Sequence, residues 1–171
     1  MELVEVKVFN NGNKELPQYE TEFAAGMDLK ADFSKINSGM DFMGDGETFI
    51  YNPQTKTVTL RGHGGRILIP TGLYIAIPDG YELQVRPRSG LALKHGITVL
   101  NSPGTIDSDY RGQICIILIN TSNREFEIKD GERIGQIVLN KVEQIKWDTV
   151  NSINELGTTV RGIGGFGHTN K

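Results

Sequence analysis

The sequence between residues 97 and 120 reads ITVLNSPGTIDSDYRGQICIILIN. Its middle part, Gly104–Gly112, places two carboxylates, a tyrosine and an arginine between two glycines, and apolar runs flank it on both sides. Apolar runs on either side of a Pro-Gly turn are typical of antiparallel strands joined by a tight connection. We therefore expect this part at the tip of a hairpin with buried arms, where its polar side chains form a site. The alternative is that Asp107, Ser108 and Asp109 are ordinary turn formers, since such residues hydrogen-bond their own backbone.

The size and charge of the chain restrict its class of function. Its 171 residues fit one domain, 1–171, that buries a core without disulfides or metals. The single cysteine, Cys115, lies in an apolar run, and no spacing of Cys and His resembles a zinc site, which disfavours catalysis by a protein-bound zinc. The net charge of −3 argues against binding of duplex nucleic acid. No apolar segment follows Met1 and no run approaches about 18 apolar residues, so we expect no signal peptide, no membrane span and a cytoplasmic location.

The remaining sequence indicates an all-β protein. Short runs of β-branched and apolar residues alternate with turn residues such as those of Pro70–Gly72, the pattern of a sandwich, jelly roll or barrel. One short helix is expected over 89–94, with Ser89 as its N-cap. Two regions, 33–65 and 157–171, do not follow the strand pattern. The expected strands are 2–9, 27–31, 66–69, 72–77, 81–86, 97–99, 113–120, 124–128 and 134–141.

The region 33–65 predicts a small inserted β-hairpin module. Two β-prone runs, 47–51 and 57–61, flank a polar turn, and the whole region is longer than the usual connection of about 4 to 6 residues. We therefore expect a surface module outside the barrel, with some apolar side chains exposed for a protein partner. The alternative is a surface hairpin without a binding role.

Two further segments carry features of anion binding. Arg86 and Arg88 stand directly before the predicted helix, whose first N–H groups attract anions, although a solvated basic loop is the alternative. The glycine-rich arm 157–171 contains a formal G-x-G-x-x-G match, but only four residues follow Gly167, so a dinucleotide site is rejected. Once ordered, the backbone amides of the arm are suited to bind an anion. The alternative is a disordered terminus without a binding role.

Five fragments of the chain, in this order, resemble the five motifs of the trimeric dUTPases. The resemblance covers nearly everything except 33–65 and points to a phage-type member with an inserted segment. It implies a jelly-roll-like β-barrel, a homotrimer whose three active sites are each built from all three chains, and Mg²⁺-dependent hydrolysis of dUTP to dUMP and pyrophosphate. The fragments are Ala25–Leu29, Arg88–Ala92, Gly104–Gly112, Gly131–Gln136 and Arg161–Gly167.

The resemblance assigns the reacting end of the nucleotide to charged residues. Asp107 would act as general base on the water that attacks the α-phosphorus and would contact the sugar 3′-hydroxyl. Asp28 would organise the metal indirectly, with Mg²⁺ held mainly by substrate phosphates and water. Arg161 would close onto the γ-phosphate. The residues expected to hold the phosphates are Arg88, Ser89, Gly90 and Gln136.

It also assigns the nucleoside end. Tyr110 would pack under the deoxyribose and exclude a 2′-hydroxyl, and Phe166 would cover the uracil. His168 departs from the serine that the family usually has after the last glycine, and we expect it to donate to a phosphate. The uracil hairpin would consist of Asn101, Gly104, Thr105 and Ile106, with Cys115 near its wall, and the closing tail would be completed by Gly167, His168 and Thr169.

Two alternatives to this function come from the same residues. A dCTP deaminase shares the fold but needs a catalytic glutamate, and the sequence has none between Glu82 and Glu125. A regulator that captures a repressor protein through 33–65 is the other, alone or in addition to hydrolysis.

Overall fold

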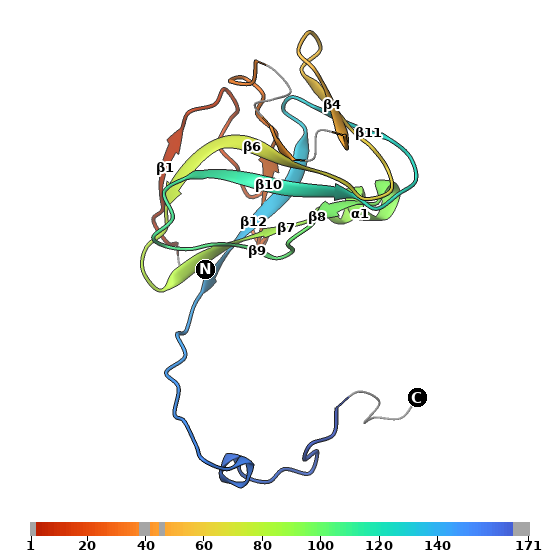
Figure 1. Ribbon diagram of the computed structural model, residues 1–171. Coiled ribbons are helices and arrows are strands. Elements are labelled where there is room, and N and C mark those ends of the chain that lie inside the picture. Colours follow the sequence, from red (N-terminus) through yellow and green to blue (C-terminus); the bar gives the residue numbers. More distant parts are fainter. Residues whose placement is uncertain (1–2, 38–41, 45–46, 166–171) are drawn as a thin grey trace.

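The computed structural model describes residues 3–37, 42–44 and 47–165, and Figure 1 shows their arrangement. Nearly all regular structure is β, with one α-helix and one short 3-10 helix. The strands are β1 (Lys7–Asn10), β2 (Met27–Lys30), β3 (Met43–Gly44), β4 (Phe49–Asn52), β5 (Thr57–Leu60), β6 (Gly65–Ala76), β7 (Tyr81–Arg86), β8 (Ile97–Val99), β9 (Gly104–Ile106), β10 (Gln113–Asn120), β11 (Phe126–Lys129) and β12 (Arg133–Lys141). The helices are α1 (Ser89–His95) and η2 (Ile153–Leu156). The all-β class with a short helix is confirmed.

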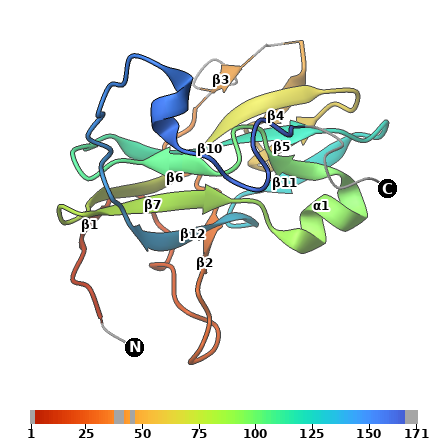
Figure 2. The same cartoon turned by 90° about the horizontal axis from the view of Figure 1, so that it is seen from below.

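Three antiparallel sheets form the body. The first has the order β1-β6-β10-β8 with β3 beside β6, the second β11-β5-β4, and the third β2-β12-β7-β9. The β6–β10 layer lies over the β7–β12 layer in both views, as a jelly-roll-like barrel with unclosed sheets requires (Figures 1 and 2). Apart from β4 and β5, the paired strands are not consecutive in the chain, so segments that are distant in the sequence lie side by side in the sheets.

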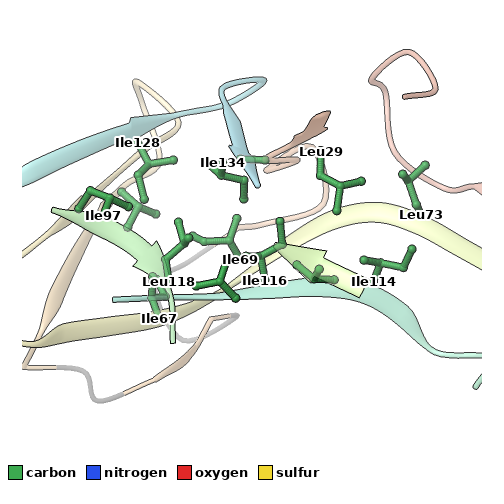
Figure 3. Packing of buried hydrophobic residues seen from close by; sticks show 14 of the residues in the cluster. Leu29, Ile67, Ile69, Leu73, Ile97, Ile114, Ile116, Leu118, Ile128 and Ile134 are labelled. Atoms are coloured by element: carbon green, nitrogen blue, oxygen red, sulfur yellow. The ribbon is translucent and has the colours of Figure 1, made fainter. Parts of the chain in front are cut away.

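One hydrophobic core lies between the sheets. Strand β10 alternates half-buried and fully buried residues, as expected for a strand with one face on the core. Side chains from all three sheets meet in this cluster, and Figure 3 shows Ile116 and Leu118 of β10 close to Ile69 of β6. Fully buried members include Leu29, Phe33, Leu60, Ile69, Ile114, Ile116, Leu118 and Ile128.

The turn predicted at Pro70–Gly72 is wrong. Instead of two strands, β6 is a single strand of 12 residues that continues through these residues. The hydroxyl of Thr71 donates to the carbonyl of Ile114 at 2.7 Å, and the amide of Gly72, at φ 74°, donates to Oε1 of Gln113 at 3.3 Å. Side chains therefore replace the ladder bonds that proline and the positive φ remove, and the strand bends without ending.

The hairpin predicted around Gly104–Gly112 has its two arms but a different tip. Strands β8 and β10 pair as expected, with Val99 opposite Leu118. Between them the chain forms β9, which leaves this sheet and pairs with β7, so that Gly104 lies opposite Val85. The polar segment therefore bridges two sheets.

The hairpin predicted within 33–65 is present, since β4 pairs with β5. Its position differs from the expectation of a module outside the barrel. Strand β5 also pairs with β11, and Phe33, Phe42, Phe49 and Leu60 are all buried in the common core. These four side chains fill the barrel interior, and among the described residues of the hairpin Ile50, 51% exposed, is the large apolar side chain that faces solvent.

Two other details concern the ends of elements. Helix α1 begins at Ser89 as its first helical residue, so the predicted N-cap is wrong by one position; Arg88 occupies the cap without a side-chain cap bond. After β12, the amide of Val142 donates to the carbonyl of Gly80, and residues 143–165 then run away from the barrel as an arm (Figure 1). Neither described helix has the length and hydropathy of a membrane span.

Candidate active site

Charged and amide side chains gather where β2, β12 and α1 meet. Nε of Arg88 donates to Oδ1 of Asp28 at 3.1 Å, and Nη1 of Arg88 donates to the carbonyl of Arg133 at 3.1 Å. Nε2 of Gln136 donates to the carbonyl of Pro87 at 2.9 Å, which ties β12 to the residue before Arg88. Three of the residues predicted to serve the phosphates and the metal, Asp28, Arg88 and Gln136, are therefore brought together by the fold.

The first residues of α1 continue this cluster. Ser89 and Gly90 are exposed, and the position of a Cβ on Gly90 has no atom within 4 Å, so the approach to the backbone is open. Gly26 is close to the same place, because a Cβ there would lie 2.5 Å from Oε1 of Gln136. Sterics thus explain why residue 26 of the Ala25–Leu29 fragment is a glycine, because any side chain there would displace the Gln136 amide.

The segment predicted to bind the uracil ring lies around β9. Gly104 is buried, and a Cβ on it would meet both Nδ2 of Asn101 and Cβ of Val85 at 3.3 Å, so this glycine allows a close approach of β9 to Asn101. Thr105 is exposed opposite Gln84, and Ile106 is half-buried. The backbone edge of β9 therefore lies beside the exposed side-chain amide of Asn101.

The acidic turn after β9 is held by its own backbone. The amide of Tyr110 donates to the carbonyl of Asp107 at 3.2 Å, and the hydroxyl of Tyr110 donates to the carbonyl of Gln113 at 2.9 Å. The carboxylate of Asp107 is exposed, and the Tyr110 ring is 42% exposed. Burial raises the pKa of the Cys115 thiol to about 11, so this half-buried residue of β10 is a neutral thiol near neutral pH.

The structure does not bring all predicted site residues to one place within a chain. Ile106 lies opposite Leu83, whereas Arg88 follows Leu83 by five residues of extended chain. Five extended residues span about 16 Å. Arg161 is exposed in the arm, where its Nε donates to the carbonyl of Gly164 at 2.8 Å. The predicted residues Phe166, Gly167, His168 and Thr169 lie outside the described residues.

Arg133 contacts the cluster but was not among the predicted site residues. Its Nη1 lies 3.3 Å from Oδ2 of Asp28 and 3.5 Å from Oε1 of Glu20. A hollow of about 120 Å³ opens beside Asp28 and Arg133 and is bordered by the loop that contains Glu20. The signal in the sequence was Gly135, which follows Arg133 by two residues and marks an irregularity in the strand.

The described residues contain no group of three or more His, Cys, Asp or Glu side chains arranged to hold a metal ion. Asp28 is the carboxylate nearest to the predicted phosphate ligands, and both of its oxygens already face arginines. A metal carried by a triphosphate and water needs only an outer carboxylate, as Mg²⁺ commonly does. The donor set fits indirect metal binding.

Comparison with known proteins agrees with this architecture. The sequence profile of the dUTPase family matches residues 50–170. The chain is 50% identical to the deoxyuridine 5'-triphosphate nucleotidohydrolase of Fusobacterium nucleatum subsp. nucleatum over 171 residues, all of both chains. It is 47% identical to the enzyme of that name from Rickettsia felis, over 97% of this chain and 95% of the relative. Among solved structures, a dUTPase of Staphylococcus bacteriophage 80alpha with dUpNHpp has the same fold, with a TM-score of 0.73 at 19% identity over 96% of this chain and 98% of the other. The chain belongs to the dUTPase family.

Proposed function

We propose that the protein hydrolyses dUTP to dUMP and pyrophosphate by in-line attack of water on the α-phosphorus. The observation that carries the proposal is the cluster of Asp28, Arg88 and Gln136 at the start of α1, in a chain of the dUTPase family. Phosphoryl transfer depends on positioning and on donors that stabilise the equatorial oxygens. In the cluster, Arg88 has N–H groups left over after its two bonds, and these are directed to the phosphates together with the amides of Ser89 and Gly90.

Asp107 takes the role of general base. Its carboxylate is exposed, so it is available to accept the proton of the attacking water. The Tyr110 bonds fix the backbone of the turn that carries it. Tyr110, whose ring is part exposed, then provides the surface on which a deoxyribose packs.

Uracil is read by the backbone edge of β9 and by Asn101. A rigid edge that matches the donors and acceptors of uracil mismatches cytosine, and a buried group left unpaired costs about 1–3 kcal/mol. Support comes from the close approach at Gly104, where an added Cβ would make a tight contact of 3.3 Å with Nδ2 of Asn101. Cys115 lines the wall of the uracil site as a small, neutral side chain.

The site is completed by other copies of the chain, in a homotrimer. The separation of about 16 Å between the β9 end and Arg88 supports this, because Asp107, which directly follows β9, and Arg88 must both act on one phosphate chain with reacting atoms about 3–3.5 Å apart. The arm supports it as well: Trp147 is 82% exposed, and Ile145, Ile153 and Leu156 are also exposed. Such side chains gain from a surface on a second copy, where Arg161 and the tail close over the nucleotide.

Mg²⁺ belongs to the proposal as the partner of the triphosphate. When bound, it neutralises phosphate charge and withdraws electron density from phosphorus. Asp28 is the carboxylate that would hold its water ligands, and Arg88 and Gln136 would bind the remaining phosphate oxygens. Arg161 would add its positive charge when the arm closes.

The decisive experiment combines substrate specificity with variants. Pyrophosphate release is measured from dUTP, UTP, dCTP and dTTP, and ammonia release from dCTP tests the deaminase alternative. We expect release of pyrophosphate from dUTP alone, and Asp107→Asn is expected to lower kcat by roughly 10²- to 10⁴-fold while dUTP still binds. An unchanged kcat would remove Asp107 from the mechanism, and deamination of dCTP would remove the proposed reaction.

Subunit mixing tests the shared site. Asp107→Asn and Arg88→Gln chains are unfolded together and refolded as a 1:1 mixture, with each variant refolded alone as the control. If the two residues of one site come from different chains, random association restores roughly a quarter of the sites. Recovery no greater than that of the separate variants would contradict a site built across chains.

Binding of a repressor protein through 33–65 stays a prediction. Within the described part of the segment its support is the exposed Ile50, since Phe42 and Phe49 are buried. A pull-down with candidate repressors, comparing wild type with Ile50→Asp, tests it, and equal capture by both proteins would contradict it.

A further inference from the structure

We propose that Arg133 is a positioning residue, which holds Asp28 and Arg88 in the orientation that binds the phosphates. The inference rests on the proposed phosphate role of Arg88. Arg133 faces Asp28 with its guanidinium, 3.3 Å from Oδ2, and receives Arg88 on its backbone carbonyl at 3.1 Å. One residue thereby contacts both members of the Asp28–Arg88 pair, through two different groups.

A β-bulge explains why Arg133 reaches this place. Strand β12 pairs with β2 so that Gln136 lies opposite Asp28 and Arg133 opposite Lys30, with a register shift between Arg133 and Gly135. In a regular strand, residues three apart point to opposite faces. The bulge adds one residue to β12 and so changes which face its side chains point to. Asp28 and Lys30 of β2 lie on the same face of the sheet, and their partners Gln136 and Arg133 therefore lie on that face too. Arg133 and Gln136 are therefore both directed to the Asp28 face, while Ile134 between them is buried.

The bonds around Asp28 show what Arg133 adds. Oδ1 of Asp28 accepts from Nε of Arg88 at 3.1 Å, and Oδ2 faces Nη1 of Arg133 at 3.3 Å. Each oxygen thus has its own guanidinium, and the carboxylate plane is fixed from two sides. Since Nε and Nη1 of Arg88 are both engaged, its Nη2 group remains for a ligand. Without the Arg133 side chain, Oδ2 of Asp28 loses its guanidinium and the carboxylate is held through Oδ1 alone, while the backbone carbonyl at position 133 still accepts from Arg88.

The exposures of the pairs indicate which contact matters. The Arg133 side chain is 48% exposed, and of the two carboxylates that it faces, Asp28 is the shielded one, with its side chain 21% exposed. The outer pair of Arg133 with Glu20 is longer, at 3.5 Å, and the Glu20 side chain is 72% exposed. Exposed ion pairs of this kind contribute little. The effect of Arg133 is therefore expected to act inward, through Asp28, and not through Glu20.

The test is a set of variants assayed with dUTP and Mg²⁺. Arg133→Gln is expected to raise KM about 5- to 30-fold, the loss of a charge-assisted contact, with kcat changed less than about 3-fold. Arg133→Lys keeps the charge but not the fork, and we expect KM between that of Arg133→Gln and wild type. Arg124→Gln, which removes an exposed charge from the loop before β11, is the matched control and should leave KM within about 2-fold.

A double-mutant cycle gives the readout that a merely structural role would not move. In an Asp28→Asn background, Arg133→Gln should change KM by less than about 2-fold, because its partner is already gone. The same KM increase in both backgrounds would overturn the inference, and so would an Arg133→Lys protein with wild-type KM, since charge alone would then suffice. Arg88→Gln separately tests the phosphate role: if its KM equals that of wild type, the proposed function of the cluster fails, whatever the Arg133 variants show.

Discussion

Leu60 provides a direct test of whether the segment 33–65 is part of the barrel. Its side chain is fully buried, and in the second sheet it lies between Phe49 of β4 and Phe126 of β11. Leu60→Ala removes three carbons from this position. At about 0.8 kcal/mol for each buried carbon, the transfer loss is about 2.4 kcal/mol, and the cavity raises the total to about 3–4 kcal/mol.

Urea unfolding, followed by far-UV circular dichroism, measures this cost. All proteins are compared at one protomer concentration, because association contributes to apparent stability. The matched control is Ile50→Ala on the same hairpin, whose side chain is 51% exposed and whose loss should change stability by less than about 0.5 kcal/mol. If Leu60→Ala costs no more than the control, the segment does not support the core, and replacing it by a short loop would be harmless.

Three further predictions concern other residues. Burial alone would raise the pKa of Asp32, but hydrogen bonds from Ser34 and from the Asn13 amide and the charge of Lys14 lower it below 3.8. Its stabilisation is therefore present above the unfolded pKa and lost as the pH falls through the folded one, so Asp32→Asn should flatten the acid limb of a urea-midpoint against pH profile, and an unchanged profile would contradict this. Cys115, with a pKa of about 11, should react with iodoacetamide at pH 8 at least about tenfold more slowly than free cysteine, followed by mass spectrometry, and an equal rate would show an accessible thiolate. In Gly135→Ala the new Cβ would lie 2.8 Å from Cδ1 of Ile116, so we expect a loss of about 1–3 kcal/mol in the same urea assay, and wild-type stability would mean that the bulge relaxes freely.

Much of the fold was predictable because strand alternation and turn residues are local signals. Strands β7, β8 and β10 have the predicted bounds, since their alternation or apolar character ends at clear turn residues. Pro70–Gly72 was misread because the side chains that replace the missing ladder bonds, Thr71 and Gln113, act across strands and leave no local pattern. The core role of 33–65 was missed for a similar reason. A hairpin carries no information about which distant strand, here β11, will pair with it.

In the candidate site, too, some residues could be predicted from local sequence, whereas others depend on how distant strands pair. Asp28, Arg88 and Gln136 were predicted and are joined by the fold. Arg133 was not among the predicted site residues: a period of two would place it on the face opposite Gln136, and the bulge reverses this. The distance between β9 and Arg88 follows from the register of β9 on β7, which the sequence of either strand does not specify.

The edge position of β2 has a consequence for the order of folding. Its one strand neighbour in the described sheets is β12, and Lys30 pairs with Arg133, which is translated 103 residues later. At about 5–20 residues per second, the ribosome makes the partner roughly 5–20 s after β2. During that time the backbone groups of Met27–Lys30 have no ladder. Because β12 pairs with β2 and its Arg133 carbonyl also holds Arg88, we expect the Asp28–Arg88 bond to form when this last strand docks, and the return of activity in a refolding experiment to mark that step.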